Sequence, residues 1–177
     1  MPDSAFVARL NEQIANEFAA HQQYVANAVH YDGETFPQLA RFFYQQALEE
    51  RDHAMMMVQY LLDKDIRPLI PGISNVVNDF ANALVPLELA LQQEIAVTEQ
   101  IETLAKTARA EGDYVGEQFM QWFLKEQVEE VSAMTTLVNV AKRAGDNLFH
   151  LEDFLARELV GNEGSDPTAP KAAGGAV

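Results

Sequence analysis

The sequence predicts an all-α protein: a four-helix bundle with a long crossover between its second and third helices, followed by a short C-terminal fifth helix. Three observations support this prediction. Four long stretches repeat apolar residues at spacings near three, four and seven, as amphipathic helices require. Pro68, Pro71 and Gly72 interrupt the chain between the second and third stretch, and a shorter amphipathic stretch follows the fourth.

The first two helices are predicted from their apolar stripes and from the signals at their ends. Asp3 or Ser4 is suited to cap the first helix, which is expected to run to about His30. The residues Asp-Gly-Glu at 32–34 form a turn signal. Pro37 is suited to the first turn of the second helix, which we expect to extend over 37–64.

The remaining connections set the predicted topology. Residues 65–82 are too long for a tight hairpin and fit an extended crossover along the bundle. The third helix is expected to begin near Pro86 and end near Gly112, and the fourth to cover 113–144 before Gly145. A short, a long and a short connection give two antiparallel hairpins joined by one crossover.

The end of the chain contains a short helix and a tail of different composition. Residues 147–159 carry one apolar stripe and are expected to form a fifth helix, which must pack on the bundle end or on another subunit. We therefore expect one domain over 1–160. The tail, 161–177, is rich in Gly, Ala and Pro and is predicted to be disordered.

Composition excludes several classes of function. The net charge is −15, from 27 acids against 12 Lys and Arg, which argues against nucleic acid as a partner and favours cations. Cysteine is absent, so a metal site must use oxygen and nitrogen ligands. No secretory leader and no run of about 20 apolar residues occurs, so we expect a cytoplasmic protein without a membrane partner.

Six residues of the four long stretches are candidate metal ligands, because each lies on or beside an apolar stripe. They are Glu17, Glu50, His53, Glu94, Gln127 and Glu130. Residues three apart share a helix face, so Glu50 and His53 reach one point. Buried carboxylates repel one another and are costly to desolvate, and divalent cations remove both penalties. The pattern predicts a di-iron type of site inside the bundle.

Four other residues have open interpretations. Glu49, Glu126 and Glu129 point partly away from the predicted site, because a helix turns about 100° per residue. They are solvated glutamates, an adjoining third cation position, or a surface along which iron passes onward. Tyr24 follows Glu17 by seven residues and shares its face. It is either a core tyrosine with a satisfied hydroxyl, or a residue that hydrogen-bonds a ligand and supplies an electron.

The segments that carry these residues resemble a known family. They read LNEQIANEF with Tyr24 following, QQALEERDHAM, LQQEIAVTEQ and FMQWFLKEQVEEV. Their order and spacing over about 6–160 resemble non-haem bacterial ferritins, and the chain is particularly similar to mycobacterial and related actinobacterial members. The resemblance implies an iron-storage protein whose 24 subunits form a hollow shell around a ferric mineral. It also implies ferroxidase activity, in which O₂ or H₂O₂ oxidises Fe²⁺.

The resemblance also implies roles for individual residues. Glu17, Glu50 and His53 would bind one iron, and Glu50, Glu94 and Glu130 the second. Gln127 would lie in the second shell or contact bridging oxygen, and Tyr24 matches the site tyrosine of the family. A third iron would take the four glutamates Glu49, Glu126, Glu129 and Glu130.

Sequence differences from related families narrow the range of expected cofactors and activities. Bacterioferritins carry a second Glu-x-x-His, where this chain has Gln127-Val-Glu-Glu130. Asp52 stands where their haem methionine would fall, so haem is not expected. The alternatives are a ferritin-like di-iron oxidase or peroxidase, a DNA-protecting mini-ferritin, and a non-enzymatic helical interaction protein. The tail carries a further hypothesis, that it docks the shell inside a larger protein compartment.

Overall fold

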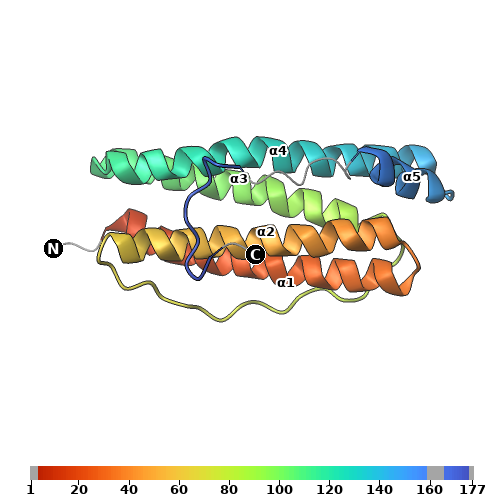
Figure 1. The fold of residues 1–177 in the computed structure, drawn as a ribbon, viewed down its shortest axis with the longest axis horizontal. Helices are drawn as coiled ribbons and strands as arrows, with labels where there is room; N and C mark the ends of the chain where they lie inside the picture. The colour runs from red at the N-terminus through yellow and green to blue at the C-terminus, as the bar shows by residue number, and fades with distance from the viewer. Residues whose placement is uncertain (1–3, 159–165, 176–177) are drawn as a thin grey trace.

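The computed structural model describes residues 4–158 and 166–175, and this part of the chain contains five helices and no strand (Figure 1). The helices are α1 (Ala5–Gly33), α2 (Pro37–Asp63), α3 (Val85–Glu111), α4 (Tyr114–Ala144) and α5 (Phe149–Glu158). The predicted fold class is confirmed. Within the described residues, no helix is long and apolar enough to span a bilayer.

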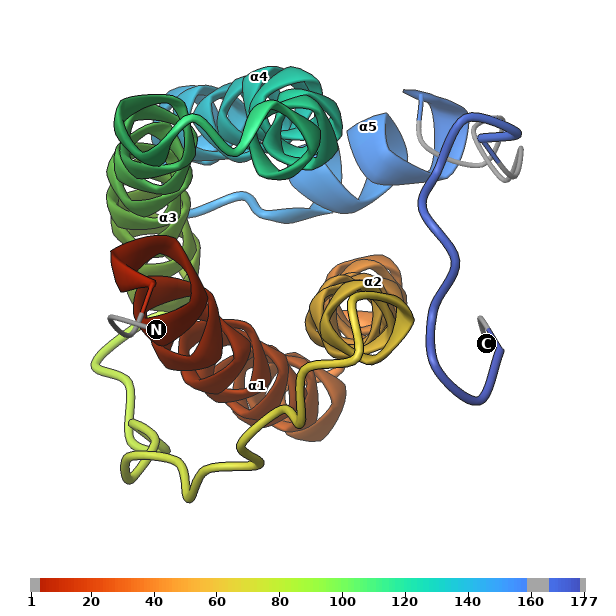
Figure 2. The ribbon, with the colours of Figure 1, turned by 90° about the vertical axis from the view of Figure 1, so that its left-hand side faces the viewer.

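The four long helices form two hairpins. α1 lies beside α2, α3 lies beside α4, and the crossover between α2 and α3 runs along the bundle from one end to the other (Figures 1 and 2). α1 continues to Gly33, three residues beyond the expected end, so the turn begins at Glu34 instead of Asp32. This topology places the middle of all four helices at one level.

The ends of the helices follow local chemistry. The Ser4 side chain caps α1 by accepting from the backbone N–H of Val7, and Asp113 caps α4 by accepting from that of Gly116. Gly112, at the end of α3, has a φ of 74°, a left-handed conformation that glycine adopts without a Cβ clash. Pro37 begins α2 as predicted.

The apolar core is divided into two clusters along the bundle. One contains Tyr24, Phe43, Leu87 and Met134 and lies toward the α5 end. The other contains Ile14, Met57, Val97 and Phe123 and lies toward the opposite end. On every long helix the predicted ligands fall in the sequence interval between the two clusters. A polar layer therefore interrupts the core at mid-length.

α5 packs on the end of its own bundle, against α2 and α4. Leu151 and Leu155 are buried there, while the expected stripe residue Leu159 lies outside the described residues. The Glu152 carboxylate accepts from the backbone N–H groups of Gln38 (2.8 Å) and Leu39 (2.9 Å) at the start of α2. α5 thus supplies a cap that α2 lacks locally, since Phe36 makes no side-chain cap.

Part of the tail contacts the bundle. Of residues 161–177, for which composition predicts disorder, the structure describes 166–175, without a helix. Asp166 accepts a hydrogen bond from Trp122 Nε1 of α4 at 3.1 Å, and the backbone N–H of Ala173 donates to the carbonyl of Met55 in α2 at 3.0 Å. This segment lies across the α2–α4 side of the bundle (Figure 2). Specific contacts give it a position that its composition does not predict.

Candidate metal centre

Five charged side chains and one amide are buried together at the middle of the bundle. Glu17, Glu50, His53, Glu94, Gln127 and Glu130 are each only 1–5% exposed. α1 contributes Glu17, α2 contributes the second glutamate and the histidine, α3 contributes Glu94, and α4 contributes the last two. Ionised carboxylates are rarely buried without a partner. The arrangement therefore requires protons or cations to balance its charge.

Three of these residues form the group best arranged to hold one ion. Ligand atoms of Glu17, Glu50 and His53 all lie within 4.8 Å of one another, and no other such group of three occurs among the described residues. His53 Nδ1 lies 3.4 Å from Glu50 Oε2. Glu17 Oε2 is buried and has no hydrogen-bond partner. A carboxylate oxygen left free in this position is suited to a cation.

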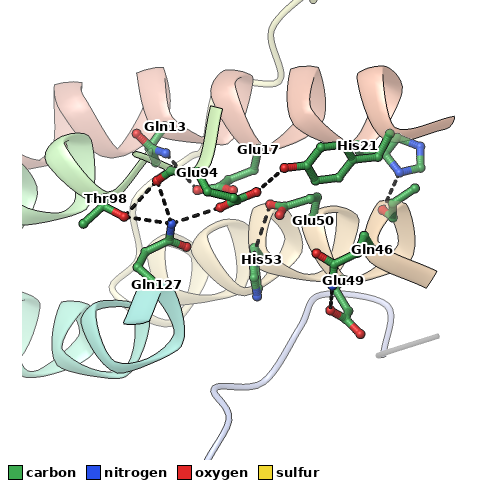
Figure 3. Close-up of polar contacts among 12 residues, drawn as sticks. Gln13, Glu17, His21, Gln46, Glu49, Glu50, His53, Glu94, Thr98 and Gln127 are labelled. Carbon is green, nitrogen blue, oxygen red and sulfur yellow. Dashed lines mark hydrogen bonds and ion pairs between the residues drawn. The ribbon is translucent and has the colours of Figure 1, made fainter. Parts of the chain in front are cut away.

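Glu94 approaches from α3 and is held by two donors. The Tyr24 hydroxyl donates to Glu94 Oε1, and Gln127 Nε2 donates to Glu94 Oε2 at 3.1 Å (Figure 3). Gln127 also donates to Thr98 Oγ1 at 3.2 Å. Glu94 and Glu130 lie outside the group of three. Gln127 thus acts here as a donor that orients Glu94, and the Tyr24 hydroxyl is satisfied by the same carboxylate.

Burial and mutual repulsion dominate the electrostatics of the centre. Burial raises the pKa of Glu50 well above its ordinary value, and the charges of Glu94 and Glu17 raise it further. The pKa of Glu130 is raised in the same way, by burial and then by Glu94. Burial also raises the pKa of Glu94, although the hydrogen bonds from Tyr24 and Gln127 oppose the change. A cation bound among these carboxylates would relieve the same repulsion.

Three polar residues of the centre were not predicted from the sequence. Gln13 Nε2 donates to Glu17 Oε1 at 2.8 Å, Thr98 Oγ1 donates to the backbone carbonyl of Glu94 at 2.8 Å, and Gln46 is 7% exposed. Each lies four residues from a predicted ligand of the same helix. Spacing of four on a helix places two side chains side by side. A search for polar residues at that distance from each ligand would have identified all three.

The second group of glutamates forms a more exposed cluster beside the centre. Glu49 and Glu126 are partly buried and Glu129 is exposed. Burial raises the pKa of Glu126, and the nearby charges of Glu129 and Glu49 contribute to the shift. The charge of Glu49 also raises the pKa of Glu130. The cluster therefore adjoins the buried centre through Glu130, and its role in binding a third cation remains a prediction.

Aromatic rings enclose His53 on the side of α4. Its ring centroid lies 5.6 Å from that of Trp122 and 5.7 Å from that of Phe123, both in edge-on orientations. Trp122 in turn donates to Asp166 of the tail. The imidazole is therefore oriented by packing against its aromatic neighbours and by the approach of Glu50.

Comparisons with known proteins find similar sequences and a similar fold. Residues 7–144 match the ferritin family model, described as a ferritin-like domain. "Ferritin BfrB" of Mycolicibacterium smegmatis is 63% identical over 175 residues, covering 99% of this chain and 96% of that protein. "Bacterial non-heme ferritin" of Staphylococcus aureus is 37% identical over 138 residues, 78% of this chain and 83% of that protein. The solved structure titled "Humanized Archaeal ferritin" superposes with a TM-score of 0.84 at 26% identity, covering 89% and 97% of the two chains.

Proposed function

This chain belongs to the ferritin family, and we propose that it stores iron by oxidising Fe²⁺ at the buried carboxylate centre and depositing a ferric mineral inside a hollow multisubunit shell. The observation that carries the proposal is the convergence of Glu17, Glu50 and His53 within 4.8 Å, with Glu94 and Glu130 buried at the same level. Oxygen and nitrogen donors of this kind suit iron.

The centre offers two adjoining iron positions. Glu17 and His53 would hold one Fe²⁺, Glu94 and Glu130 would hold the second, and Glu50 would lie between them. The charges of Glu94, Glu17 and Glu130 all raise the pKa of Glu50, which supports a position of its carboxylate between the two pairs. Glu17, Glu50 and Glu94 are directed toward one another from three helices (Figure 3).

The reaction would take one electron from each iron. Two Fe²⁺ ions reduce one O₂ with two protons to H₂O₂ and become two Fe³⁺. With H₂O₂ as oxidant, two further protons are consumed and two water molecules form. Dividing the electrons between two ions avoids release of a one-electron oxygen radical. Carboxylate oxygens are hard ligands and favour Fe³⁺ over Fe²⁺, so the ligand set assists the oxidation.

The ligands also exchange protons for iron. The pKa values of Glu50 and Glu130 are raised by burial and by neighbouring carboxylates, so these groups hold protons to a higher pH than exposed glutamates do. Fe²⁺ would compete with these protons for the carboxylate oxygens. Its positive charge would also relieve the repulsion between the carboxylates.

Alanine substitution at the centre tests the proposal. Glu50→Ala and Glu130→Ala remove a ligand each, and we expect the initial rate of aerobic Fe²⁺ oxidation to fall by about 100-fold, followed as ferric absorbance in a stopped-flow instrument. Glu99→Ala is the control, because Glu99 lies on α3 five residues beyond Glu94 but is exposed. An unchanged initial rate in both ligand variants would refute the proposed oxidation centre.

A further inference from the structure

Thr98 belongs to a hydrogen-bonded unit between α3 and α4. Its Oγ1 donates to the backbone carbonyl of Glu94, one turn earlier in α3, at 2.8 Å. A hydroxyl carries one hydrogen, so Oγ1 faces α4 only as an acceptor. Gln127 Nε2 of α4 donates to this oxygen at 3.2 Å (Figure 3). Thr98 thus contacts the amide that orients the Glu94 carboxylate.

The nitrogen of the Gln127 amide has more acceptors than hydrogens. Nε2 donates to Thr98 Oγ1 at 3.2 Å, to the backbone carbonyl of Glu94 at 3.2 Å and to Glu94 Oε2 at 3.1 Å. An amide nitrogen carries two hydrogens, so three acceptors share them. If the carboxylate moves away, the hydroxyl and the carbonyl accept one hydrogen each, and the amide nitrogen stays satisfied.

Both oxygens of the Glu94 carboxylate accept a hydrogen bond. Oε1 accepts from the Tyr24 hydroxyl, and Oε2 accepts from Gln127. A cation that binds Glu94 competes with these donors for the same lone pairs. Gln127 is only 4% exposed, so an N–H of its amide that loses its acceptor does not gain solvent in return. Glu94 Oε2 is therefore released most easily when Nε2 keeps two other acceptors.

We propose that Thr98 is a positioning residue of the metal centre, which supplies the acceptor that lets Gln127 release Glu94 Oε2 to an iron ion. The two hydrogens of Nε2 then go to the Thr98 hydroxyl and to the backbone carbonyl of Glu94. The nitrogen stays on the side of α3, so the amide keeps the orientation drawn in Figure 3. The inference rests on the proposed function and deepens it, because it gives a residue that does not touch iron a part in iron binding.

Anaerobic titration with Co²⁺, followed by visible absorbance, tests the assignment without any oxidation step. We expect Thr98→Val to bind the Co²⁺ held by Glu94 about tenfold more weakly than the unmodified protein, because Nε2 loses one of its two remaining acceptors. The Co²⁺ held by Glu17 and His53 should bind as before. Glu94→Ala lacks the carboxylate and identifies which step of the titration belongs to it.

Two further variants serve as controls. Thr98→Ser keeps the hydroxyl and should bind Co²⁺ as the unmodified protein does. Thr103→Val is the matched control, because Thr103 Oγ1 makes the same bond in α3, to the backbone carbonyl of Glu99 at 2.8 Å, from an exposed position. It should leave both Co²⁺ affinities unchanged.

A double-mutant cycle shows whether Thr98 acts through Gln127. In Gln127→Leu the amide is absent, so adding Thr98→Val should change the affinity for Co²⁺ by less than about twofold. A general structural role of Thr98 would instead weaken Co²⁺ binding in both backgrounds.

Three outcomes would overturn the inference. They are equal Co²⁺ binding by Thr98→Val and the unmodified protein, a loss in Thr98→Ser as large as in Thr98→Val, and a tenfold loss that persists with Gln127→Leu. If Thr98→Val does not fold, a crystal structure of the Co²⁺-loaded unmodified protein decides. Nε2 must then lie within about 3.2 Å of Thr98 Oγ1 and of the Glu94 carbonyl, and a hydrogen bond retained to Glu94 Oε2 would contradict the release.

The proposed function can fail separately from this inference. Unmodified protein that binds both Co²⁺ ions but does not oxidise Fe²⁺ would refute the proposed oxidation centre. Weaker Co²⁺ binding in Thr98→Val alone would still support the role of Thr98.

Discussion

At the scale of single residues, the centre is a set of buried acids whose side chains are oriented by neutral hydrogen-bond donors. Tyr24, Gln127 and Gln13 each donate to one carboxylate, so the side chains are oriented before any cation arrives. Glu17 Oε2 is buried without a donor, and in the proposed function it is an oxygen available to iron. Preorganised donors around the ligands reduce the cost of assembling the site on binding.

Tyr24→Phe removes the hydrogen bond from the tyrosine hydroxyl to Glu94, and we expect it to slow Fe²⁺ oxidation about tenfold. A hydrogen bond to a charged group contributes about 1.5–3 kcal/mol, and a rate about tenfold lower corresponds to the lower end of this range. The hydroxyl of Tyr24 lowers the pKa of Glu94, so its removal raises that pKa and the deficit should be larger at about pH 6 than at about pH 8.

The matched control for this prediction is Tyr31→Phe. Tyr31 belongs to the same apolar cluster, but its hydroxyl donates to the carbonyl of Ala83, away from the carboxylates. Tyr31→Phe should leave the oxidation rate unchanged. Equal rates in all three proteins at both pH values would contradict the role of the Tyr24 hydroxyl.

The stability of the metal-free protein should depend on the charge of Glu50. Its pKa in the folded state lies above the ordinary value of 4.5, so its contribution to stability is present below that value and is lost as the pH rises through the raised pKa. Glu50→Gln carries no charge at any pH. Metal-free Glu50→Gln should therefore unfold at a higher temperature than the unmodified protein at about pH 8, with the gap closing toward pH 4.5.

Calorimetry with a chelator present measures this gap. Glu102→Gln is a suitable control, because Glu102 is an exposed glutamate of α3 and should show no comparable dependence on pH. A gap of constant size between pH 4.5 and 8 would show that the charge of Glu50 does not oppose folding.

At the scale of secondary structure, the fold depends on helix ends as much as on helix faces. Gly116, in the first turn of α4, is closely packed: a Cβ there would lie 2.7 Å from Phe6 Cε1 of α1 and 2.7 Å from Asp113 Oδ2 of the cap. Only glycine lets α1 approach α4 this closely while Asp113 caps the helix. The turn between α3 and α4 is thus fitted closely to the start of α1.

Gly116→Ala should destabilise the folded protein by about 1–3 kcal/mol, because the added methyl displaces either the Phe6 ring or the Asp113 cap. Gly33→Ala is the control: no atom lies within 4 Å of a Cβ there, and helical alanine stabilises by about 0.4–1 kcal/mol. Thermal unfolding of Gly116→Ala and Gly33→Ala at equal protein concentration measures both effects. Equal melting temperatures of the two variants would contradict the close packing at Gly116.

At the scale of the whole molecule, the single subunit leaves apolar side chains uncovered. Leu69 and Ile70 in the crossover are 65% and 67% exposed, and Phe149 at the start of α5 is 78% exposed. Large apolar side chains with this degree of exposure are candidates for burial in a subunit interface. The structural neighbours of the chain are ferritins, and we expect an assembly of like subunits to cover these residues.

We expect a closed assembly of 24 subunits, which at 19.7 kDa each amounts to about 470 kDa. Ile70→Glu places a charge in the exposed crossover and should shift the protein to smaller species, because a buried unpaired charge is strongly unfavourable. Size-exclusion chromatography with light scattering measures both masses. A monomer of unmodified protein would rule out the shell.

Much of this protein was determined by the sequence alone, because helices obey local rules. Apolar spacing, the residues Ser4, Pro37 and Gly145 at helix ends, and the interrupted segment near Pro68 predict the five helices and their order. The same spacing predicts that Glu17, Glu50, His53, Glu94 and Glu130 face inward, and the structure buries all five together.

Tertiary contacts decided the position of the tail and the polar contacts around the centre. These contacts join residues that no local sequence pattern connects. The expected disorder of the tail did not anticipate that Asp166 accepts from Trp122 and that Ala173 reaches Met55. The burial of Gln46 beside Glu49 likewise depends on how α2 packs against its neighbours. Helical periodicity predicts which face of a helix carries a given side chain. Only the packing of one helix against another determines which charges meet there and which polar atoms are left without a partner.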